Sequence, residues 1–474
     1  MKTRVLLFVV LCVASVRPMN AQVLISDSLL ASYTIDELND QGIANADNAI
    51  EAYRLIYHTI DPFGQPTIAS GAVIIPVGSS CTHAMAAYMH GTILNREDVP
   101  SRLNSEIVVA YYLGAFRYVA VLPDYLGLGD SPGPHPYMHA ASEASASVDM
   151  LRAAREFCAQ KGVALNGQLF LTGYSQGGHV CMATHKMIEE QFPEEFQVTA
   201  SAPCSGPYDA SGVQAEVIVA EEPYPAPYYL PYVLFSYKYV YPWLYDDVHE
   251  ILVEPYATLL PPLFLGNNGS GVVDDVMPVV PNDILVETML QEFITDPEHP
   301  FREALRENDL YDWTPAARVR MFYCDADDHV FYQNSTVALQ AMLDNGAADV
   351  DAINAGAGLD HNGCAFPALL NAKGVFDALQ SPCSGIGVPE IDRITWSLWP
   401  NPASDRIDLV VSHDVLTKVP WNLWTMDGRL SASGTISSTG DRATIMLDGR
   451  SSGAYLLELA PPQGPVRLRV DLVR

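Results

Sequence analysis

LFLTGYSQGGH, residues 169–179, joins an apolar run to a glycine-rich turn and then to a helical segment. Within it, Gly173, Ser175 and Gly177 form a G-x-S-x-G pattern. The two glycines let neighbouring backbone approach without a Cβ clash, so the serine hydroxyl can be raised on a tight strand-to-helix turn. The free N–H groups at the start of the helix then point toward that hydroxyl. The stretch predicts a nucleophilic Ser175, with the N–H of Gln176 as one oxyanion donor.

Short apolar runs alternate with helical segments on both sides of this turn. The runs are MAAYMHGT, YVAVLPDY, VTASAPC, RVRMFYCD and DVDAINAG, and helices are expected over residues 142–161 and 178–191. Such alternation indicates a mostly parallel sheet that is covered by helices on both faces. Upstream, AYRLIYHTI and ASGAVIIP flank the turn DPFGQP and predict an antiparallel hairpin.

Residues 207–316 interrupt the alternation. They include PYPAPYYLPYVLFSYKYVYPWLY, residues 223–245, which holds eight tyrosines. An insertion of this length is too long for a simple loop and predicts a cap over the site. The tyrosines suit a wall against an amphipathic substrate, and packing between cap helices explains them equally well.

A serine nucleophile needs a histidine base and an acid that orients the histidine. On a sheet of this kind both follow the serine, the acid first. His361 lies in the glycine-rich stretch GLDHNGCAF, in a loop before a helix expected at 365–379, and is the predicted base. The other histidines after Ser175 lie on the helix leaving it, in the insertion, beside an acidic cluster or in the tail (His179, His185, His249, His299, His329 and His413).

The acidic cluster is FYCDADDHVF, residues 322–331, directly after the run RVRMFYC. Asp325, Asp327 and Asp328 all have the right position for the acid of the triad. Adjacent side chains in an extended turn point in opposite directions, so Asp327 and Asp328 cannot both face His361. The cluster lacks the length and the glycine of a calcium loop, and no metal is expected there. The residues alone leave the choice of acid open.

Several longer motifs resemble the α/β-hydrolases of the secretory lipase and esterase type. They are GYSQGG, YHTIDPFGQPTIASGAVIIP, the strand end MHGT and PDYLGLGDSPGPHPYMHA, and the resemblance covers residues 22 to about 380. It implies an α/β-hydrolase domain over residues 22–383, with a mostly parallel sheet, helices on both faces and an inserted cap. It also implies a serine hydrolase that cleaves carboxylic esters through an acyl-serine, with no metal or organic cofactor and a small-molecule or lipid ester as substrate.

The same resemblance suggests two further site residues. In the family pattern H-G-x-x-D-x-x-V, Asp327 takes the position of the acid and Val330 that of the valine. Tyr323 and Cys324 replace the His-Gly pair, which keeps Asp325 as the rival acid. The residue after the His-Gly of MHGT is Thr92, so its N–H is the expected second oxyanion donor.

Other activities stay open. The same fold hydrolyses amides, and a peptidase that binds free amino termini would need carboxylates near the cap, where Glu221, Glu222, Asp246 and Asp247 lie. A carbohydrate esterase is a further alternative. A non-catalytic adhesin on the same scaffold would have no reason to keep Ser, Asp and His in order at three strand ends.

The first 21 residues follow the plan of a secretory signal peptide, with Lys2 and Arg4, an apolar run at 5–13 and small residues up to Ala21. The apolar run is too short to span a bilayer, and no later segment is an uninterrupted apolar stretch of spanning length. We therefore expect an exported protein with no integral membrane segment. With 26 basic and 56 acidic residues, the formal net charge is -30, which argues against a nucleic-acid partner.

The cysteines of an exported protein can form disulfides. Disulfides are permitted, but the odd number of cysteines after the signal leaves at least one thiol, and the pairing is open (Cys81, Cys158, Cys181, Cys204, Cys324, Cys364 and Cys383).

Residues 384–395 read as a linker. Residues 396–474 carry equal numbers of acidic and basic side chains, and the runs RIDLVV, WNLWTM, ATIML and GAYLLEL predict a small antiparallel β-sandwich.

The tail also resembles the C-terminal sorting domain of the type IX secretion system of Gram-negative bacteria. The resemblance rests on PNPASDRIDL, TMDGRL, SSGAYLLEL and LRVDLVR, in that order. It implies that secretion machinery is a partner, that the protein crosses the outer membrane of a Gram-negative bacterium, and that it ends up secreted or on the cell surface. A generic β-sandwich binding module is the alternative.

Overall fold

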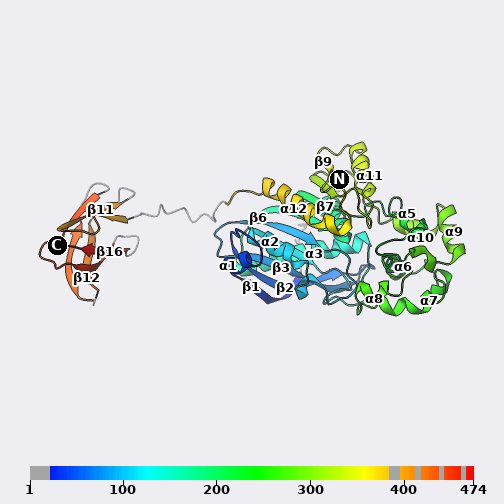
Figure 1. Ribbon diagram of the computed structural model, residues 1–474, viewed down its shortest axis with the longest axis horizontal. Coiled ribbons are helices and arrows are strands. Elements are labelled where there is room, and N and C mark those ends of the chain that lie inside the picture. The colour runs from blue at the N-terminus through cyan, green and yellow to red at the C-terminus, as the bar shows by residue number, and fades with distance from the viewer. Residues whose placement is uncertain are drawn as a thin grey trace, which may run out of the picture. The chain divides into compact units, whose positions relative to one another are not determined.

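The computed structural model describes residues 22–383, 396–411, 418–426, 428–436, 442–460 and 466–473. The expected signal peptide, residues 1–21, and the expected linker, residues 384–395, lie outside the described residues. By their internal contacts the residues form two compact units, Met1–Ile386 and Gly387–Arg474 (Figure 1).

A nine-stranded sheet forms the centre of the larger unit, in the order β1-β2-β3-β5-β4-β6-β7-β8-β9. The pairs from β1 to β3 and the pair β3–β5 are antiparallel, and every neighbouring pair from β5 through β4 to β9 is parallel. The parallel part puts the carboxyl ends of its strands along one edge. The strands are β1 (Leu24–Tyr33), β2 (Ala49–Ile60), β3 (Pro66–Val77), β4 (His83–Met89), β5 (Tyr118–Pro123), β6 (Leu165–Tyr174), β7 (Val198–Cys204), β8 (Arg318–Tyr323) and β9 (Val350–Asn354).

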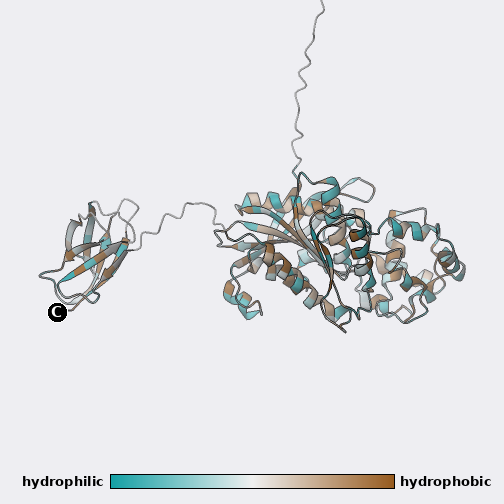
Figure 2. Ribbon diagram, turned by 90° about the horizontal axis from the view of Figure 1, so that it is seen from above, coloured by the Kyte–Doolittle hydropathy of each residue, from teal (hydrophilic) through white to brown (hydrophobic). Residues whose placement is uncertain are grey.

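Helices cover both faces of the sheet, as Figure 2 shows from above. The helices α3 (Ala140–Lys161) and α4 (Gln176–Gln191) share a core with one face, and α2 (Ile107–Ala115) and α12 (His361–Leu379) share a core with the other. Central strands such as β5 are buried along their whole length, which explains their continuous apolar sequence. Two further helices pack at the margins, α1 (Ile35–Asp40) and α11 (Gln333–Asp344), and a short 3₁₀ turn, η1 (Pro100–Arg102), precedes α2.

Three elements differ from the expectations. The edge strand β1 was not foreseen, because its sequence LISDSLLASY mixes polar and apolar residues without regular alternation. Helix α4 begins directly after Ser175 rather than near Gly178. The expected loop around His361 is wrong, since α12 begins at His361, where the Asp360 side chain accepts a hydrogen bond of 2.7 Å from the N–H of Gly363 and caps the helix.

The insertion between β7 and β8 folds into a cap, whose apolar core also includes Leu94, Tyr137 and Met138 from the preceding chain. Helix α6 (Tyr229–Val240) crosses this core and carries many of the tyrosines. The remaining elements are short: α5 (Glu216–Val219), η2 (Val248–Glu250), α7 (Tyr256–Leu259), η3 (Pro261–Phe264), α8 (Ser270–Asp274), η4 (Pro281–Ile284), α9 (Glu287–Thr295) and α10 (Pro300–Arg306).

The smaller unit is all-β, which confirms the expected fold class of the tail. One sheet has the order β10-β11-β14, and the other has the order β13-β12-β15-β16. Apolar residues from both sheets, among them Leu409, Leu423 and Leu457, form one core. The strands are β10 (Trp396–Trp399), β11 (Arg406–Val411), β12 (Val419–Thr425), β13 (Leu430–Ile436), β14 (Arg442–Met446), β15 (Gly453–Leu459) and β16 (Val466–Leu472).

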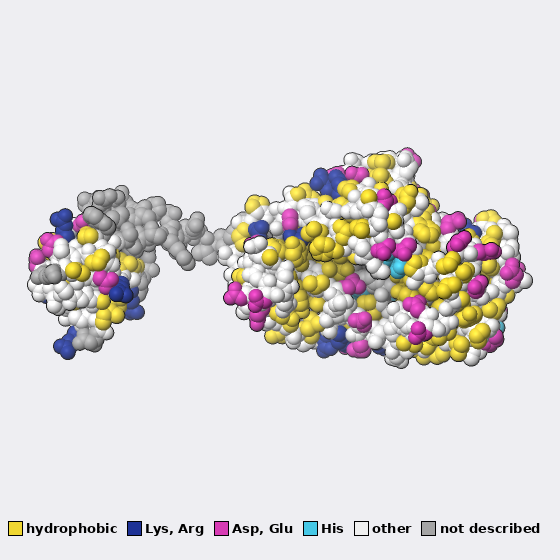
Figure 3. Space-filling model, viewed as in Figure 1, with side chains coloured by type: hydrophobic (Ala, Val, Ile, Leu, Met, Phe, Trp, Pro, Cys, Tyr) yellow, Lys and Arg dark blue, Asp and Glu magenta, His cyan; other side chains and the backbone are white. Residues whose placement is uncertain are grey.

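The surface of the larger unit carries many carboxylates. Asp and Glu side chains are spread over the face that Figure 3 shows, in keeping with the net charge of -30. Among the helices of the described residues, none combines the length and the apolar composition that crossing a bilayer requires.

Candidate active site

Ser175 stands at the turn between β6 and α4 in a strained backbone conformation. Its φ is 60° and its ψ is -121°, a region that residues with a side chain rarely adopt. A Cβ on Gly177 would lie 2.0 Å from the carbonyl oxygen of Met89, and one on Gly173 would lie 2.2 Å from the carbonyl oxygen of Gly177. Glycine is therefore required at both positions, as the G-x-S-x-G pattern predicts.

The structure brings Ser175, His361 and Asp327 together in one hydrogen-bonded chain. Nε2 of His361 lies 2.9 Å from Oγ of Ser175. Nδ1 of His361 lies 2.8 and 2.9 Å from the two carboxylate oxygens of Asp327. An ionised carboxylate can only accept, so Nδ1 carries the hydrogen and Nε2 is free to accept the serine proton. All three side chains are buried.

The three aspartates of the acidic cluster have different partners. Oδ1 of Asp327 also accepts from the N–H groups of His329 and Val330, at 3.1 and 2.8 Å. Asp325 is exposed and accepts from the N–H of Gly358 at 2.7 Å. Asp328 accepts from the backbone N–H of His361 at 3.2 Å. Only Asp327 reaches the imidazole ring, and no three His, Cys, Asp or Glu side chains of the described chain are grouped so that they could hold a metal ion.

A disulfide that the sequence could not assign links the two segments that carry Asp327 and His361. It joins Cys324, at the end of β8, to Cys364, in the first turn of α12. Tyr174, the residue before the serine, donates a hydrogen bond of 2.5 Å to the carbonyl oxygen of His361. A second disulfide joins Cys81 to Cys383, and the buried thiols Cys158, Cys181 and Cys204 are free. His361 is thus tied both to the strand that leads to Ser175 and to the loop that holds Asp327.

The two expected oxyanion donors belong to different elements. Gln176 is the first residue of α4, where a backbone N–H has no partner within the helix. Thr92 follows β4 in a turn that is held by its neighbours. Glu106 accepts from the N–H of Gly91 at 3.1 Å, and the Tyr125 hydroxyl donates to the carbonyl oxygen of His90 at 3.0 Å.

A buried polar network that the sequence did not reveal fixes the side chain of Gln176. Its amide nitrogen donates to Oε1 of Glu143 at 2.7 Å and to Nε2 of His135 at 2.9 Å. Oε2 of Glu143 lies 3.1 Å from Nδ1 of His179. Burial alone would raise the pKa of Glu143, but its contacts with His179, His135 and Gln176 lower that pKa below its usual value. The only signal in the sequence is a charged residue among the small residues of AASEASAS.

Two buried histidines, His135 in this network and His139 near it, predict a fold that is sensitive to acid. Burial lowers the pKa of His135 and of His139 to about 4. Since an unfolded histidine has a pKa of about 6.5, the unfolded chain takes up their protons first, and stability falls as the pH drops from about 6.5 toward 4. We expect each histidine to remove about 2 kcal/mol from the free energy of unfolding between pH 7 and pH 5.

Urea unfolding at pH 7 and pH 5 measures this loss, with His139→Gln as the comparison. The variant should lose less stability on acidification than the parent, by about 2 kcal/mol. An equal loss in the two proteins would show that His139 is not buried in its neutral form.

His329 stacks on His361. The ring centroids of His329 and His361 are 4.6 Å apart, with 17° between the planes. Burial lowers the pKa of His329, and the neighbouring His361 adds a smaller effect in the same direction. The stacked ring is therefore neutral at neutral pH. Its carbonyl oxygen accepts from the Tyr224 hydroxyl at 2.7 Å and from the side-chain amide of Gln214 at 3.0 Å.

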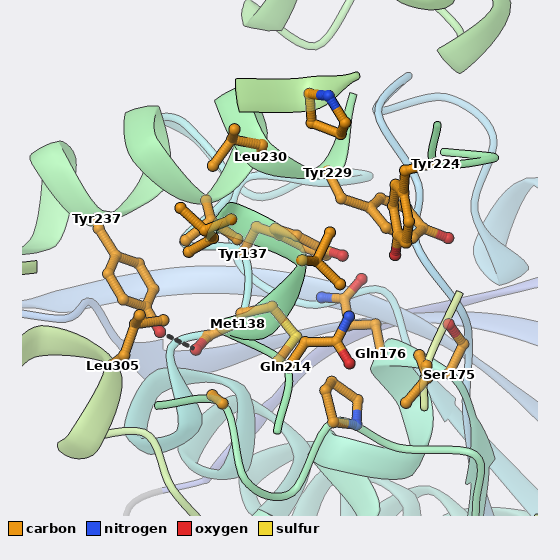
Figure 4. Close-up of a pocket in the computed structure, with 17 residues that line it drawn as sticks. Tyr137, Met138, Ser175, Gln176, Gln214, Tyr224, Tyr229, Leu230, Tyr237 and Leu305 are labelled. Atoms are coloured by element: carbon orange, nitrogen blue, oxygen red, sulfur yellow. Dashed lines mark hydrogen bonds between the residues drawn. The ribbon is translucent and has the colours of Figure 1, made fainter. Parts of the chain in front are cut away.

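An apolar cavity of about 90 Å³ lies between Ser175 and the cap (Figure 4). Helix α6 contributes Tyr229, Leu230, Val233 and Tyr237 to its wall. Other tyrosines of the cap serve packing: Tyr232 stacks on Tyr137 with centroids 4.2 Å apart, and its hydroxyl donates to the carbonyl oxygen of Ile93. Some tyrosines of the segment therefore line the cavity, and others pack within the cap. No Asp or Glu is among the described residues that line the cavity.

No protein-family model and no curated protein matches the sequence. Solved structures do match. The rice cell wall degrading esterase LipA from Xanthomonas oryzae is similar with 28% identity and a TM-score of 0.69, over 76% of this chain and 100% of that chain. Candida antarctica lipase A is similar with 14% identity and a TM-score of 0.56, over 77% of this chain and 84% of that chain, a likeness of fold alone. The larger unit of this chain has the α/β-hydrolase fold, with an inserted cap, and a small all-β unit follows it.

Proposed function

We propose that this protein is a serine hydrolase that cleaves carboxylic esters through an acyl-serine intermediate. The observation that carries the proposal is the hydrogen-bonded chain from Ser175 through His361 to Asp327, set at the floor of an apolar cavity. The similarity to an esterase over the whole of that chain supports the same class of activity.

In the proposed reaction Oγ of Ser175 attacks the ester carbonyl carbon while its proton moves to Nε2 of His361. The carbonyl π electrons move onto oxygen, and the N–H groups of Gln176 and Thr92 bind the resulting oxyanion. The intermediate collapses, the C–O bond to the alcohol breaks, and the leaving oxygen takes the proton from His361. Water then attacks the acyl-serine while His361 takes a proton from it. When the second intermediate collapses, this proton returns to Oγ of Ser175 and the acid is released. Asp327 stabilises the imidazolium in both halves.

The cavity favours esters over the peptidase alternative. An aminopeptidase has to bind a charged amine close to the nucleophile, which takes a carboxylate in the site. Glu221, Glu222, Asp246 and Asp247 of the cap are exposed, and none of them lines the cavity next to Ser175. The apolar wall matches an uncharged acyl or alcohol group instead. A carbohydrate esterase remains the second candidate, because the similar LipA esterase degrades the rice cell wall.

A fluorophosphonate probe tests the proposal directly. The intact protein should be labelled and Ser175→Ala should not, because the probe reacts only with an activated serine. Labelling is to be followed by hydrolysis assays on aryl esters of increasing acyl length, aminoacyl anilides and acetylated polysaccharides. If the folded protein were not labelled, the proposal that it is a serine hydrolase would be refuted. Cleavage of the anilides without the esters would favour the peptidase, and release of acetate from the polysaccharides alone would favour the carbohydrate esterase.

We further propose that the all-β unit directs export through a type IX secretion system, to the medium or the cell surface of a Gram-negative bacterium. The four ordered motifs from PNPASDRIDL to LRVDLVR support this proposal. A fluorescent protein fused to an N-terminal signal peptide and to residues 384–474 should leave cells that have the system. It should stay in the periplasm of a mutant without the system. Equal export in both strains would leave a generic binding module as the explanation.

A further inference from the structure

Tyr229, the first residue of α6, reaches from the cap toward the nucleophile. It lines the same cavity as Ser175, and Figure 4 shows it beside Tyr224 on the side of the cavity that holds Ser175. Its ring centroid is 5.9 Å from that of His329, the residue that stacks on His361. The cap therefore extends a phenol into the neighbourhood of the triad.

The hydroxyls of Thr92 and Ser175 lower the pKa of the Tyr229 phenol, against the larger rise that burial causes, so both belong to its surroundings. Ser175 follows β6, and Thr92 follows β4, the neighbouring strand of the sheet. A carbonyl that Ser175 attacks has to turn its oxygen toward the N–H groups of Gln176 and Thr92. The phenol thus lies next to the place where that oxygen becomes negative.

The protonation state of the phenol suits a hydrogen-bond donor. Burial raises the pKa of Tyr229 above its usual value of about 10, while the hydroxyls of Tyr228, Thr92 and Ser175 oppose part of that rise. At neutral pH Tyr229 therefore keeps its proton. Its environment is buried and apolar, where a hydrogen bond to a charged oxygen is stronger than in water.

We propose that the Tyr229 hydroxyl donates a third hydrogen bond to the oxyanion, an inference that rests on the ester hydrolase activity proposed above. As Oγ of Ser175 bonds to the carbonyl carbon, its proton goes to His361 and the π electron pair moves to the carbonyl oxygen. Tyr229 then donates its O–H to this oxygen. The phenol keeps its proton throughout, and the hydrogen bond is released when the C–O bond to the alcohol breaks.

This role makes the cap part of the catalytic machinery. The other two donors lie outside the cap, Gln176 at the start of α4 and Thr92 after β4. Tyr229 belongs to the insertion between β7 and β8. A cap displaced from Ser175 would leave the triad intact and the oxyanion with one donor fewer. Full activity then requires that α6 holds Tyr229 beside Ser175.

Tyr229→Phe removes the hydroxyl and keeps the ring, so it isolates the donor. We expect kcat to fall about 10²-fold, with KM changed less than about threefold, because the bond forms in the transition state. The affinity for a boronic acid that mimics the tetrahedral intermediate should fall by the same factor as kcat. Tyr239→Phe is the matched control: Tyr239 lies on the same helix, packs against Phe63 and is not among the residues that line the cavity.

The outcomes separate this inference from the proposed function. If the parent protein neither reacts with the fluorophosphonate nor cleaves esters, the proposed function fails. If the parent is active and Tyr229→Phe keeps its kcat, or loses kcat without losing boronic-acid affinity, only the third donor is refuted. Should Tyr229→Phe fold poorly, 3-fluorotyrosine at this position keeps the ring and strengthens the donor. Boronic-acid binding should then be tighter, and equal or weaker binding would overturn the proposal.

Discussion

Asp327→Asn is expected to lower kcat about 10⁴-fold while leaving the fold intact. Oδ1 of Asp327 already accepts from the N–H groups of His329 and Val330, so the amide oxygen of an asparagine would occupy that side. Its NH₂ group would then replace Oδ2, which lies 2.9 Å from Nδ1 of His361. A donor in this place forces Nδ1 to accept and puts the hydrogen on Nε2. The base would be held in the tautomer that cannot take the serine proton.

Steady-state kinetics on an aryl ester measures the loss, and Asp325→Asn is the matched control. Asp325 is exposed and accepts only from the N–H of Gly358 among its recorded hydrogen bonds, a role that the amide oxygen of asparagine can keep. The control should retain kcat within about threefold. If Asp325→Asn abolished activity and Asp327→Asn did not, the rival register of the acid would be right.

The contrast between these aspartates shows which site residues can be predicted from the sequence and which cannot. Ser175 and His361 follow from chain order and from their positions at strand ends, since few other residues of their type occupy such positions. The acid does not follow in this way, because Asp325, Asp327 and Asp328 are chemically identical and adjacent. Their directions are set by the turn after β8 and by the N–H groups that Asp327 accepts from. Only the likeness to a family register favoured the residue that the structure brings to His361.

The sequence also could not predict the contacts between distant segments, for a different reason. Glu143 and Gln176 meet across the packing of α3 on α4, and nothing in either helix specifies that partner. Tyr229 is one of eight tyrosines in its segment, and it differs from Tyr232 only in its place on α6. The alternating pattern of strands and helices predicts layers well, because burial on a face depends on period alone. It does not predict which side chains meet where the layers join.

Removing the disulfide between Cys324 and Cys364 is expected to weaken both the fold and the reaction. The bridge closes a segment with a sequence separation of 40, and loop entropy gives it about 3–4 kcal/mol of the free energy of unfolding. Its half-cystines lie three residues before Asp327 and three residues after His361. Without the bridge the acid loop and the base helix can shift relative to each other. A misplacement of about 1 Å costs about 10²-fold in rate, so we expect kcat to fall 10- to 100-fold for Cys324→Ala/Cys364→Ala.

The second disulfide provides the control that separates stability from positioning. The bridge from Cys81 to Cys383 has a sequence separation of 302, so loop entropy predicts a stabilisation at least as large. It joins the start of β4 to the residues after α12, where no member of the triad lies. Urea unfolding and kcat at 25 °C should therefore respond differently: both double variants lose stability, and only Cys324→Ala/Cys364→Ala loses kcat in its folded form. Equal kcat in the two variants would mean that hydrogen bonds alone, such as that from Tyr174 to His361, hold the triad in register.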